Sequence, residues 1–345
     1  MLTDLTKQER KDVFTFVGAT KRIRAEAAEK DWWVVQVIRA LFSSQFRDNM
    51  SFKGGTSLSK GWGLIERFSE DIDIAIDREF LGLTGELTKT QISDKLRRAS
   101  CSFVRTDLKA AVETGLADSG IPKEFFNVDV EVTPVSTTDP EKIYVRYESV
   151  FASDIDKYVK PRVVIEAGAR SIFEPTVVRT IRSFVSEILP DAEKIPDDRI
   201  DVKTAPAQRT FLEKIFLLHE EFHKEGSVRI DRMSRHLYDI ERMMDTDVGQ
   251  AINDRNLYLD IVDHRRRFIG LKGFDYNTLM PQTIDIIPPE NVRAQWAGDY
   301  RSMQESMIFG ESLSFDELVK RIKILNDRIN CLKYRNIRSM LSIKG

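Results

Sequence analysis

The chain has 345 residues, enough for about two domains of typical size, and its 53 Lys and Arg residues nearly balance its 55 Asp and Glu residues. The formal charge of −2 excludes a global attraction to DNA or to an anionic membrane. The two cysteines, Cys101 and Cys331, form no CxxC pair, so a disulfide framework is not expected. The N-terminus is too polar for a signal peptide, and no stretch approaches the ~18 apolar residues of a membrane span. We therefore expect a cytoplasmic protein without a membrane partner.

The first half of the chain predicts a mixture of helices and strands. Apolar residues at helical spacing predict a helix over residues 31–46 behind a possible Asp31 cap, and residues 51–53 predict a short strand that runs into Gly54 and Gly55. A second helix can begin at Thr56. Residues 71–77 alternate acidic and apolar side chains, as a half-buried strand does. A helix over 90–117 and strands over 127–132, 142–147 and 162–167 complete this half, which we read as α/β (α+β).

From about residue 174 the pattern becomes helical. Apolar stripes over residues 211–222 and 230–244 predict amphipathic packed helices, and Ser314 with Glu317 forms a capping box for a helix that ends near residue 330. We accordingly expect one domain over residues 1–173 and a helical domain over 174–345.

Two aspartates on the alternating strand predict a metal site. Asp71 and Asp73 lie two residues apart, so both side chains leave the same face, roughly 6.6 Å apart at ~3.3 Å per residue. Carboxylate oxygens favour Mg²⁺ or Mn²⁺, which can bind a triphosphate and activate an attacking hydroxyl. An isolated pair of this kind is also typical of the solvated face of an edge strand.

A glycine turn upstream supports the phosphate interpretation. Gly54 and Gly55 let the backbone approach a phosphate, and a helix N-terminus with the Thr56 and Ser57 hydroxyls supplies donors. The segment is not a Walker A loop, because no glycine directly precedes Lys60.

Four segments resemble motifs of the AbiEii/AbiGii family of nucleotidyltransferase toxins. They are FKGGTSLSK at residues 52–60, RFSEDID at 67–73, FLEK at 211–214 and RHLYD at 235–239, and they occur in the family's order. The resemblance implies a polymerase-β-like nucleotidyltransferase fold, in which a mixed sheet flanked by helices carries the site and a C-terminal helical domain closes the active cleft. It also implies transfer of a nucleoside monophosphate from an NTP to RNA, with the tRNA 3′ acceptor end as one target class, or to a protein hydroxyl. Such a toxin would block translation and be restrained by an antitoxin protein.

The resemblance also implies roles for single residues. The nucleotide would be held by Gly54, Gly55, Thr56 and Ser57. Magnesium would be held by Asp71 and Asp73. Lys214 would bind and neutralise phosphate, and Asp239 would complete the catalytic site. By their own spacing, Lys214 suits a surface lysine at the edge of an apolar stripe equally well, and Asp239 a surface ion pair with Arg235.

A third carboxylate would help the attacking hydroxyl lose its proton. We choose Glu166, which lies on the strand predicted over 162–167. Asp129 and Glu131 lie on another alternating strand and remain open as competitors.

Other patterns favour alternative functions. His219, Glu220 and His223 match the HExxH pattern of zinc metallopeptidases, but Arg229 stands where the extended pattern needs a histidine. A nucleotide-binding regulatory module without turnover is a further alternative. Two basic clusters are candidates for an RNA cradle: residues 264–267, and a C-terminal tail with Lys333, Arg335, Arg338 and Lys344.

Overall fold

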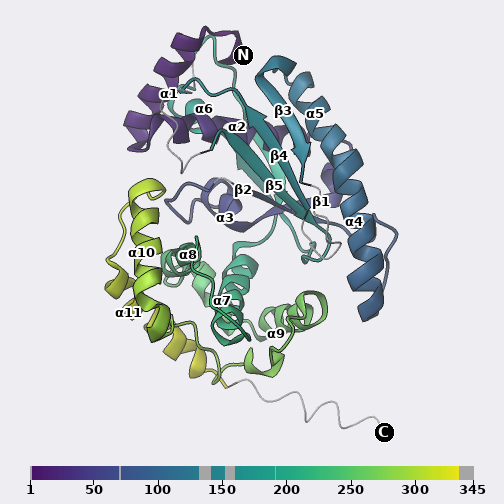
Figure 1. Ribbon diagram of the computed structural model, residues 1–345, viewed down its shortest axis with the longest axis vertical. Helices are drawn as coiled ribbons and strands as arrows, with labels where there is room; N and C mark the ends of the chain where they lie inside the picture. The colour runs from purple at the N-terminus through teal and green to yellow at the C-terminus, as the bar shows by residue number, and fades with distance from the viewer. Residues whose placement is uncertain (1, 70, 132–140, 152–159, 191, 334–345) are drawn as a thin grey trace. The chain divides into compact units, whose positions relative to one another are not determined.

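The computed structural model describes residues 2–69, 71–131, 141–151, 160–190 and 192–333. The chain forms two compact units, shown as a ribbon in Figure 1. Unit 1 comprises residues 1–206 together with 306–311, and unit 2 comprises residues 207–305 and 312–345. Within the described residues, no helix is long and apolar enough to span a membrane.

Seven strands of the described residues form one mixed sheet in unit 1, in the order β3-β4-β5-β2-β1-β7-β6. β2 runs parallel to β5 and antiparallel to β1, and β4 runs antiparallel to both β3 and β5. The strands are β1 (Met50–Lys53), β2 (Asp71–Ile76), β3 (Phe126–Val130), β4 (Glu141–Tyr147), β5 (Arg162–Gly168), β6 (Val177–Ile181) and β7 (Ile200–Thr204).

Helices of unit 1 pack against the apolar face of this sheet. Ile72, Ile74 and Ile165 are buried, while Asp71, Asp73 and Glu166 lie at alternate positions and are partly exposed, as expected of strands with one face in the core. Helices α2, α4 and α5 contact strands of the sheet (Figure 1), and the short α3 contacts β2. The helical segments of unit 1 are η1 (Leu2–Asp4), α1 (Lys7–Lys21), α2 (Ala25–Phe42), η2 (Arg47–Asn49), α3 (Gly54–Thr56), η3 (Ser57–Gly61), η4 (Gln91–Leu96), α4 (Arg97–Phe103), η5 (Val104–Leu108), α5 (Lys109–Asp118), η6 (Lys123–Phe125) and α6 (Phe184–Ile188).

Unit 2 is helical and has its own core. Helix α7 packs against α8, η7 and α9, and α8 packs against α11. Phe211, Ile215 and Leu218 of α7 are fully buried, so the predicted apolar stripe forms the core face of this helix. The helical segments are α7 (Ala207–His223), α8 (Ser234–Met243), η7 (Asp247–Asn253), α9 (Arg255–His264), η8 (Arg265–Ile269), η9 (Tyr276–Thr278), α10 (Glu290–Ser306) and α11 (Phe315–Asn330). The capping box of Ser314 and Glu317 begins α11, which confirms the prediction.

The mixed sheet flanked by helices and the helical second half confirm the expected fold class. Three details differ from the expectation. β6 and β7 follow residue 174, where only helices were expected, because these strands extend the sheet beyond β1 through tertiary pairing. Unit 1 therefore continues to Pro206, whereas the sequence places the boundary after residue 173. Asp31 is not a helix cap, because α2 begins at Ala25 and Asp31 lies buried in its middle.

A buried ion pair links α2 to the segment that follows β1. The Asp31 carboxylate pairs with the ammonium group of Lys60 and accepts a hydrogen bond of 2.7 Å from the amide of Phe184. Burial raises the pKa of Asp31, although the charge of Lys60 opposes this effect. The pair fixes the end of the glycine-containing segment against α2 and α6.

Candidate active site

β2 presents Asp71 and Asp73 on the polar face of the sheet. Both are partly exposed, and the intervening Ile72 is fully buried on the opposite face. The antiparallel register places Lys53 beside Asp73, so the end of β1 and the start of β2 lie next to each other. The turn after β1 is therefore adjacent to the predicted carboxylates.

Gly54 lies directly beneath the carboxylate of Asp73. A Cβ atom added at Gly54 would stand 1.9 Å from Asp73 Oδ2, and the φ of Gly54 is +75°. No side chain fits there, and the backbone conformation is one that favours glycine. The close approach that the structure shows at this turn is to the Asp73 carboxylate, and an approach of the same backbone to a phosphate stays a prediction.

Gly55 provides a similar close approach to an arginine. A Cβ atom at Gly55 would stand 2.6 Å from Arg67 Nη2 and 2.9 Å from Ser69 Oγ. Arg67 is 2% exposed, and its Nη1 donates to the carbonyl of Phe68. The two glycines therefore bring one carboxylate and one guanidinium against the same turn.

The hydroxyls of Thr56 and Ser57 bind the protein's own backbone. Thr56 Oγ1 donates to the carbonyl of Asp71 at 2.5 Å, and Ser57 Oγ donates to the carbonyl of Gly54 at 2.9 Å. Both residues are almost fully buried. The Thr56 bond joins the turn to β2, and the Ser57 bond lies within the turn. A direct role of the two hydroxyls in nucleotide binding stays a prediction.

The sheet register distinguishes between the candidates for the third carboxylate. Glu166 of β5 lies opposite Asp73 in the parallel pair, one strand spacing of about 4.8 Å away. Asp129 lies on β3, which β4 and β5 separate from β2, and Glu131 follows the end of β3. Asp129 is paired with Arg146 at 3.0 Å, and Glu131 accepts a hydrogen bond from Tyr144 at 2.6 Å. Glu166 is thus the candidate beside the two aspartates.

Glu166 forms an ion pair with a lysine in this structure. Lys142 Nζ lies 2.9 Å from Glu166 Oε1. Burial lowers the pKa of Lys142, but the hydrogen bond and charge of Glu166, with smaller effects of Tyr144 and Asp71, outweigh burial and raise it. Lys142 thus stays protonated in the field of these carboxylates, and the cluster favours cations.

The arrangement fits a divalent cation held jointly by the protein and a substrate. Within the described part of the chain, no group of three or more His, Cys, Asp or Glu side chains is arranged to hold a metal ion. Mg²⁺ commonly uses one or two carboxylates and completes its shell with phosphate and water oxygens. Asp71 and Asp73 next to the glycine turn supply such a donor set, and the ion itself remains a prediction.

In unit 2, Lys214 and Asp239 form a buried cluster. Lys214 Nζ lies 3.0 Å from Asp239 Oδ2 and 3.3 Å from His236 Nδ1. Asp239 is fully buried and Lys214 is 7% exposed, so neither is the surface residue that its spacing alone allowed. The structure brings together the lysine and aspartate of the two C-terminal motifs.

The HExxH segment does not form a metal site. His219 Nδ1 accepts a hydrogen bond of 2.9 Å from the amide of Asp285, and His219 Nε2 lies 3.0 Å from the Thr278 hydroxyl. Burial, with a smaller effect of His223, lowers the pKa of His219 to about 4, so this imidazole is neutral. The carboxylate of Glu220 is bound by Arg265. Both His219 nitrogens and the expected general base are thus committed to structural contacts, which removes the support for a zinc peptidase.

The first basic cluster is partly structural. Arg265 is buried in its ion pair with Glu220, so it is not available to an RNA backbone. Arg266 and Arg267 lie on the same segment and stay candidates for contact with an RNA backbone. Of the C-terminal cluster, Arg335, Arg338 and Lys344 lie outside the described residues.

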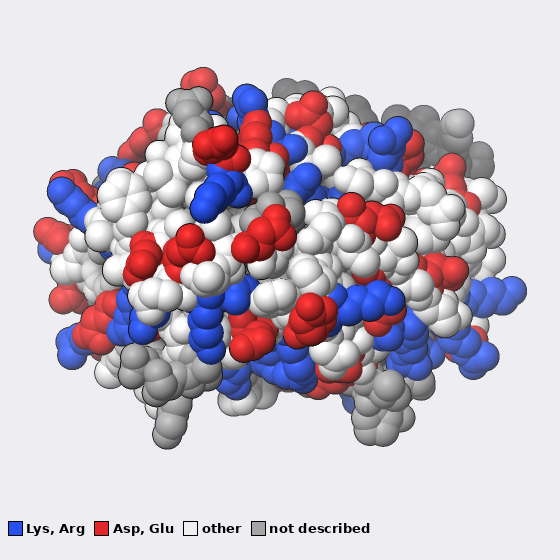
Figure 2. Space-filling model, turned by 90° about the horizontal axis from the view of Figure 1, so that it is seen from above, with Lys and Arg blue, Asp and Glu red and all other residues white. Residues whose placement is uncertain are grey.

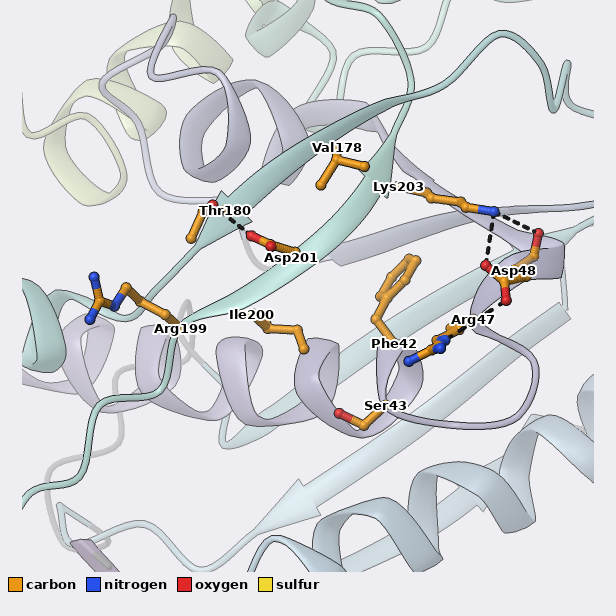
Figure 3. Close-up of a pocket in the computed structure, with 10 residues that line it drawn as sticks. All are labelled: Phe42, Ser43, Arg47, Asp48, Val178, Thr180, Arg199, Ile200, Asp201 and Lys203. Atoms are coloured by element: carbon orange, nitrogen blue, oxygen red, sulfur yellow. Dashed lines mark hydrogen bonds and ion pairs between the residues drawn. The ribbon is translucent and has the colours of Figure 1, made fainter.

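A separate hollow of about 710 Å³ lies at the β6–β7 end of the sheet. Figure 3 shows Lys203 directed toward Asp48 and Thr180 toward Asp201, and both pairs are in contact, at 2.9 Å and 2.6 Å. None of the predicted site residues lines this hollow. Its charged groups are largely satisfied by one another, so we assign it no role.

Sequence reasoning missed two residues of the site. Arg67 belongs to the second motif but was given no role, although a buried arginine beside two glycines points to a positioning function. Lys142 had no local signal, because its pairing with Glu166 follows only from the register of β4 and β5.

Comparison with known proteins agrees with this geometry. The family model described as "Nucleotidyl transferase AbiEii toxin, Type IV TA system" matches residues 37–321, which is most of the chain. The match includes β1, the glycine turn, β2, β5 and the lysine and aspartate of unit 2. No curated protein matches the chain.

Proposed function

The chain belongs to the AbiEii family of nucleotidyltransferase toxins of type IV toxin–antitoxin systems, and we propose that it transfers a nucleoside monophosphate from an NTP to an RNA hydroxyl, with release of pyrophosphate. Family membership implies an antitoxin partner. The 3′ acceptor end of tRNA is the target that we propose, and its modification in the cytoplasm would block translation.

The observation that carries this proposal is the contact between the glycine turn and the DxD strand. Asp73 lies against Gly54, so phosphates bound at the turn would adjoin both aspartates. We propose that Asp71 and Asp73 hold Mg²⁺ or Mn²⁺. When bound, such an ion would neutralise the triphosphate and favour ionisation of the attacking hydroxyl.

Glu166 and Lys142 would act on the acceptor. Glu166 lies beside Asp73 on the side away from β1, where its carboxylate can accept the proton of the attacking hydroxyl. Lys142, now paired with Glu166, would orient that carboxylate and contribute positive charge.

Lys214 and Asp239 would assist transfer from unit 2. A buried ammonium held by a carboxylate is a fixed positive charge, which suits the neutralisation of phosphate. This role rests on the family motifs and on the buried pair.

The function is tested by incubating the purified protein with each α-labelled NTP, Mg²⁺ and total bacterial RNA, followed by electrophoresis of RNA and protein. Label in a tRNA-sized band would support the proposal and identify the nucleotide. Label on protein alone would redirect it to a protein hydroxyl. Nucleotide binding without any label would instead favour a regulatory module without turnover.

A further inference from the structure

The strand order separates the two reactants of the proposed transfer. The glycine turn follows β1 on one side of β2, and Glu166 lies on β5 on the other side. In phosphoryl-type transfer the attacking and leaving oxygens lie roughly in line. An acceptor therefore approaches from the side of β5 and β4, provided that the proposed function is correct.

The polar face of β4 and β5 carries an aromatic ring beside two arginines. Tyr144 lies opposite Val164, which lies opposite Asp71, and the next pair on the same face is Arg146 with Arg162. The guanidinium carbon of Arg162 is 4.7 Å from the Tyr144 ring centre, and that of Arg146 is 5.5 Å away. We call these three residues the Tyr144 cluster. Tyr144 lies in the row that contains Asp71, two strands away, and the arginine pair lies one register step, about 6.6 Å along the strands, from that row.

The ring of the cluster is held in place. Tyr144 donates its hydroxyl to Glu131 at 2.6 Å. Burial, the hydrogen bond to Glu131 and the charge of Glu131 raise the pKa of Tyr144, so the phenol stays protonated. A neutral, oriented ring beside two cations is a surface on which a nucleobase can stack.

The cations of the cluster can exchange their present contacts for phosphate. The side chains of Arg146 and Asp129 are 51% and 46% exposed, and an ion pair in water contributes little. Among the described residues, Arg162 has no carboxylate partner and lies against the Tyr144 ring. Guanidinium groups bind phosphate oxygens with two parallel hydrogen bonds.

We propose that the Tyr144 cluster binds the single-stranded 3′ end of the RNA acceptor, with Arg146 and Arg162 on its phosphates and Tyr144 against a base. Two arginines beside a ring suit a chain that presents phosphates and unstacked bases, as single-stranded RNA does. A protein acceptor offers neither group. The distance of the cluster from Asp71 suits the nucleotides that directly precede the reacting hydroxyl.

The test compares Arg162→Glu and Tyr144→Leu with wild type, using bulk tRNA as acceptor. We expect the KM for tRNA to rise about tenfold or more, as loss of a phosphate contact or a stacking contact predicts. The KM for NTP and the kcat should change little. Arg162→Lys should restore part of the affinity, because the charge returns without the planar group.

Arg199→Glu is the matched control. Arg199 is an exposed, ion-paired arginine like Arg146, but it lies just before β7, on the other side of β2. This variant should keep the wild-type KM for tRNA. An unchanged KM in both cluster variants, or an equal loss in Arg199→Glu, would overturn the proposal.

A direct binding measurement separates this inference from the proposed function. Fluorescence anisotropy of a short 5′-labelled single-stranded RNA reports binding without turnover. The Arg162→Glu variant should bind more weakly, and the slope of log affinity against log salt should become shallower by about 0.7 for each lost phosphate contact. Equal binding by this variant and by wild type would contradict the cluster's role. If the wild type labels no RNA, but Arg162→Glu binds RNA more weakly than the wild type does, only the proposed reaction is contradicted.

Discussion

At the scale of single residues, Gly54 is the position that couples the glycine turn to β2. Its missing side chain leaves room for the Asp73 carboxylate, so turn and strand depend on each other. The sequence identified both Gly54 and Asp73, but it explained the glycine by the approach of a phosphate. In the structure the Asp73 carboxylate already occupies the space that a side chain at residue 54 would need.

We therefore expect Gly54→Ala to lower nucleotide transfer by at least about tenfold, because the new methyl group must displace Asp73. Gly63→Ala is the control. Gly63 also has a positive φ, +63°, but open space surrounds the added Cβ. It should cost about 1 kcal/mol of stability and leave transfer intact. Steady-state kinetics measure transfer by the two variants, and thermal unfolding measures their stability. An equal loss of transfer in Gly54→Ala and Gly63→Ala would show that backbone strain alone explains the loss.

The buried carboxyl group of Glu29 is expected to make the free energy of unfolding depend on pH. It is 2% exposed, and burial raises its pKa to about 7 from 4.5, although hydrogen bonds from Ser149 and Val150 oppose this shift. The folded state then binds more protons than the unfolded state between these two values. The stability contributed by protonated Glu29 is complete below pH 4.5 and is lost as the pH rises through about 7.

Glu29→Gln should remove this dependence. Relative to wild type, its free energy of unfolding should increase as the pH rises from 5 to 8, by about 3 kcal/mol at most. Urea unfolding of both proteins across this range measures the difference. A constant difference would show that Glu29 does not change its protonation on unfolding.

At the scale of elements, the register of β2, β5, β4 and β3 decides which carboxylate joins the site. The alternation of each strand was readable from the sequence, because apolar side chains face the core at every second position. The order of the strands was not, since it depends on pairing between distant segments. For this reason Glu166, Asp129 and Glu131 could not be separated before the register was known.

Glu166→Gln should lower the kcat of transfer by about 10²-fold with little effect on the KM for NTP, as expected for loss of a general base. Glu131→Gln provides the comparison, because it retains an oxygen that can accept the Tyr144 hydrogen bond. It should keep a kcat near that of wild type. Full activity of Glu166→Gln together with inactivity of Glu131→Gln would reverse the assignment.

In the helices of unit 2, the pair of Lys214 and Asp239 has a structural and a proposed catalytic component. Lys214→Met leaves a buried carboxylate without its cation, which should cost about 3–5 kcal/mol. Adding Asp239→Leu should restore much of the stability but not the transfer. Urea unfolding and labelled-NTP transfer are measured on both proteins. A stable double variant with wild-type transfer would restrict this pair to a structural role.

At the scale of the whole molecule, basic and acidic residues nearly balance. Figure 2 shows basic and acidic side chains interspersed over the face it presents, in keeping with the formal charge of −2. A nucleic acid partner would therefore need a local surface, which agrees with the small size of the Tyr144 cluster.

The chain's two compact units were only partly foreseen. The helical character of the second half was clear from its periodic apolar stripes. Residues 306–311 belong to unit 1, where the amide of Phe68 donates to the carbonyl of Met307 and the amide of Phe309 donates to that of Glu66. No local pattern marks this return, because a backbone pairing between distant segments requires no particular side chains.

The measurement that tests the account most directly compares Asp71→Asn and Asp73→Asn with Asp77→Asn in the labelled-NTP assay. Asp77 directly follows β2 and accepts a hydrogen bond from the amide of Glu79, which an asparagine oxygen can also accept. The account predicts that Asp71→Asn and Asp73→Asn fold normally but put no label on RNA, whereas Asp77→Asn labels RNA as wild type does. Wild-type labelling by Asp71→Asn and Asp73→Asn would contradict the proposed site.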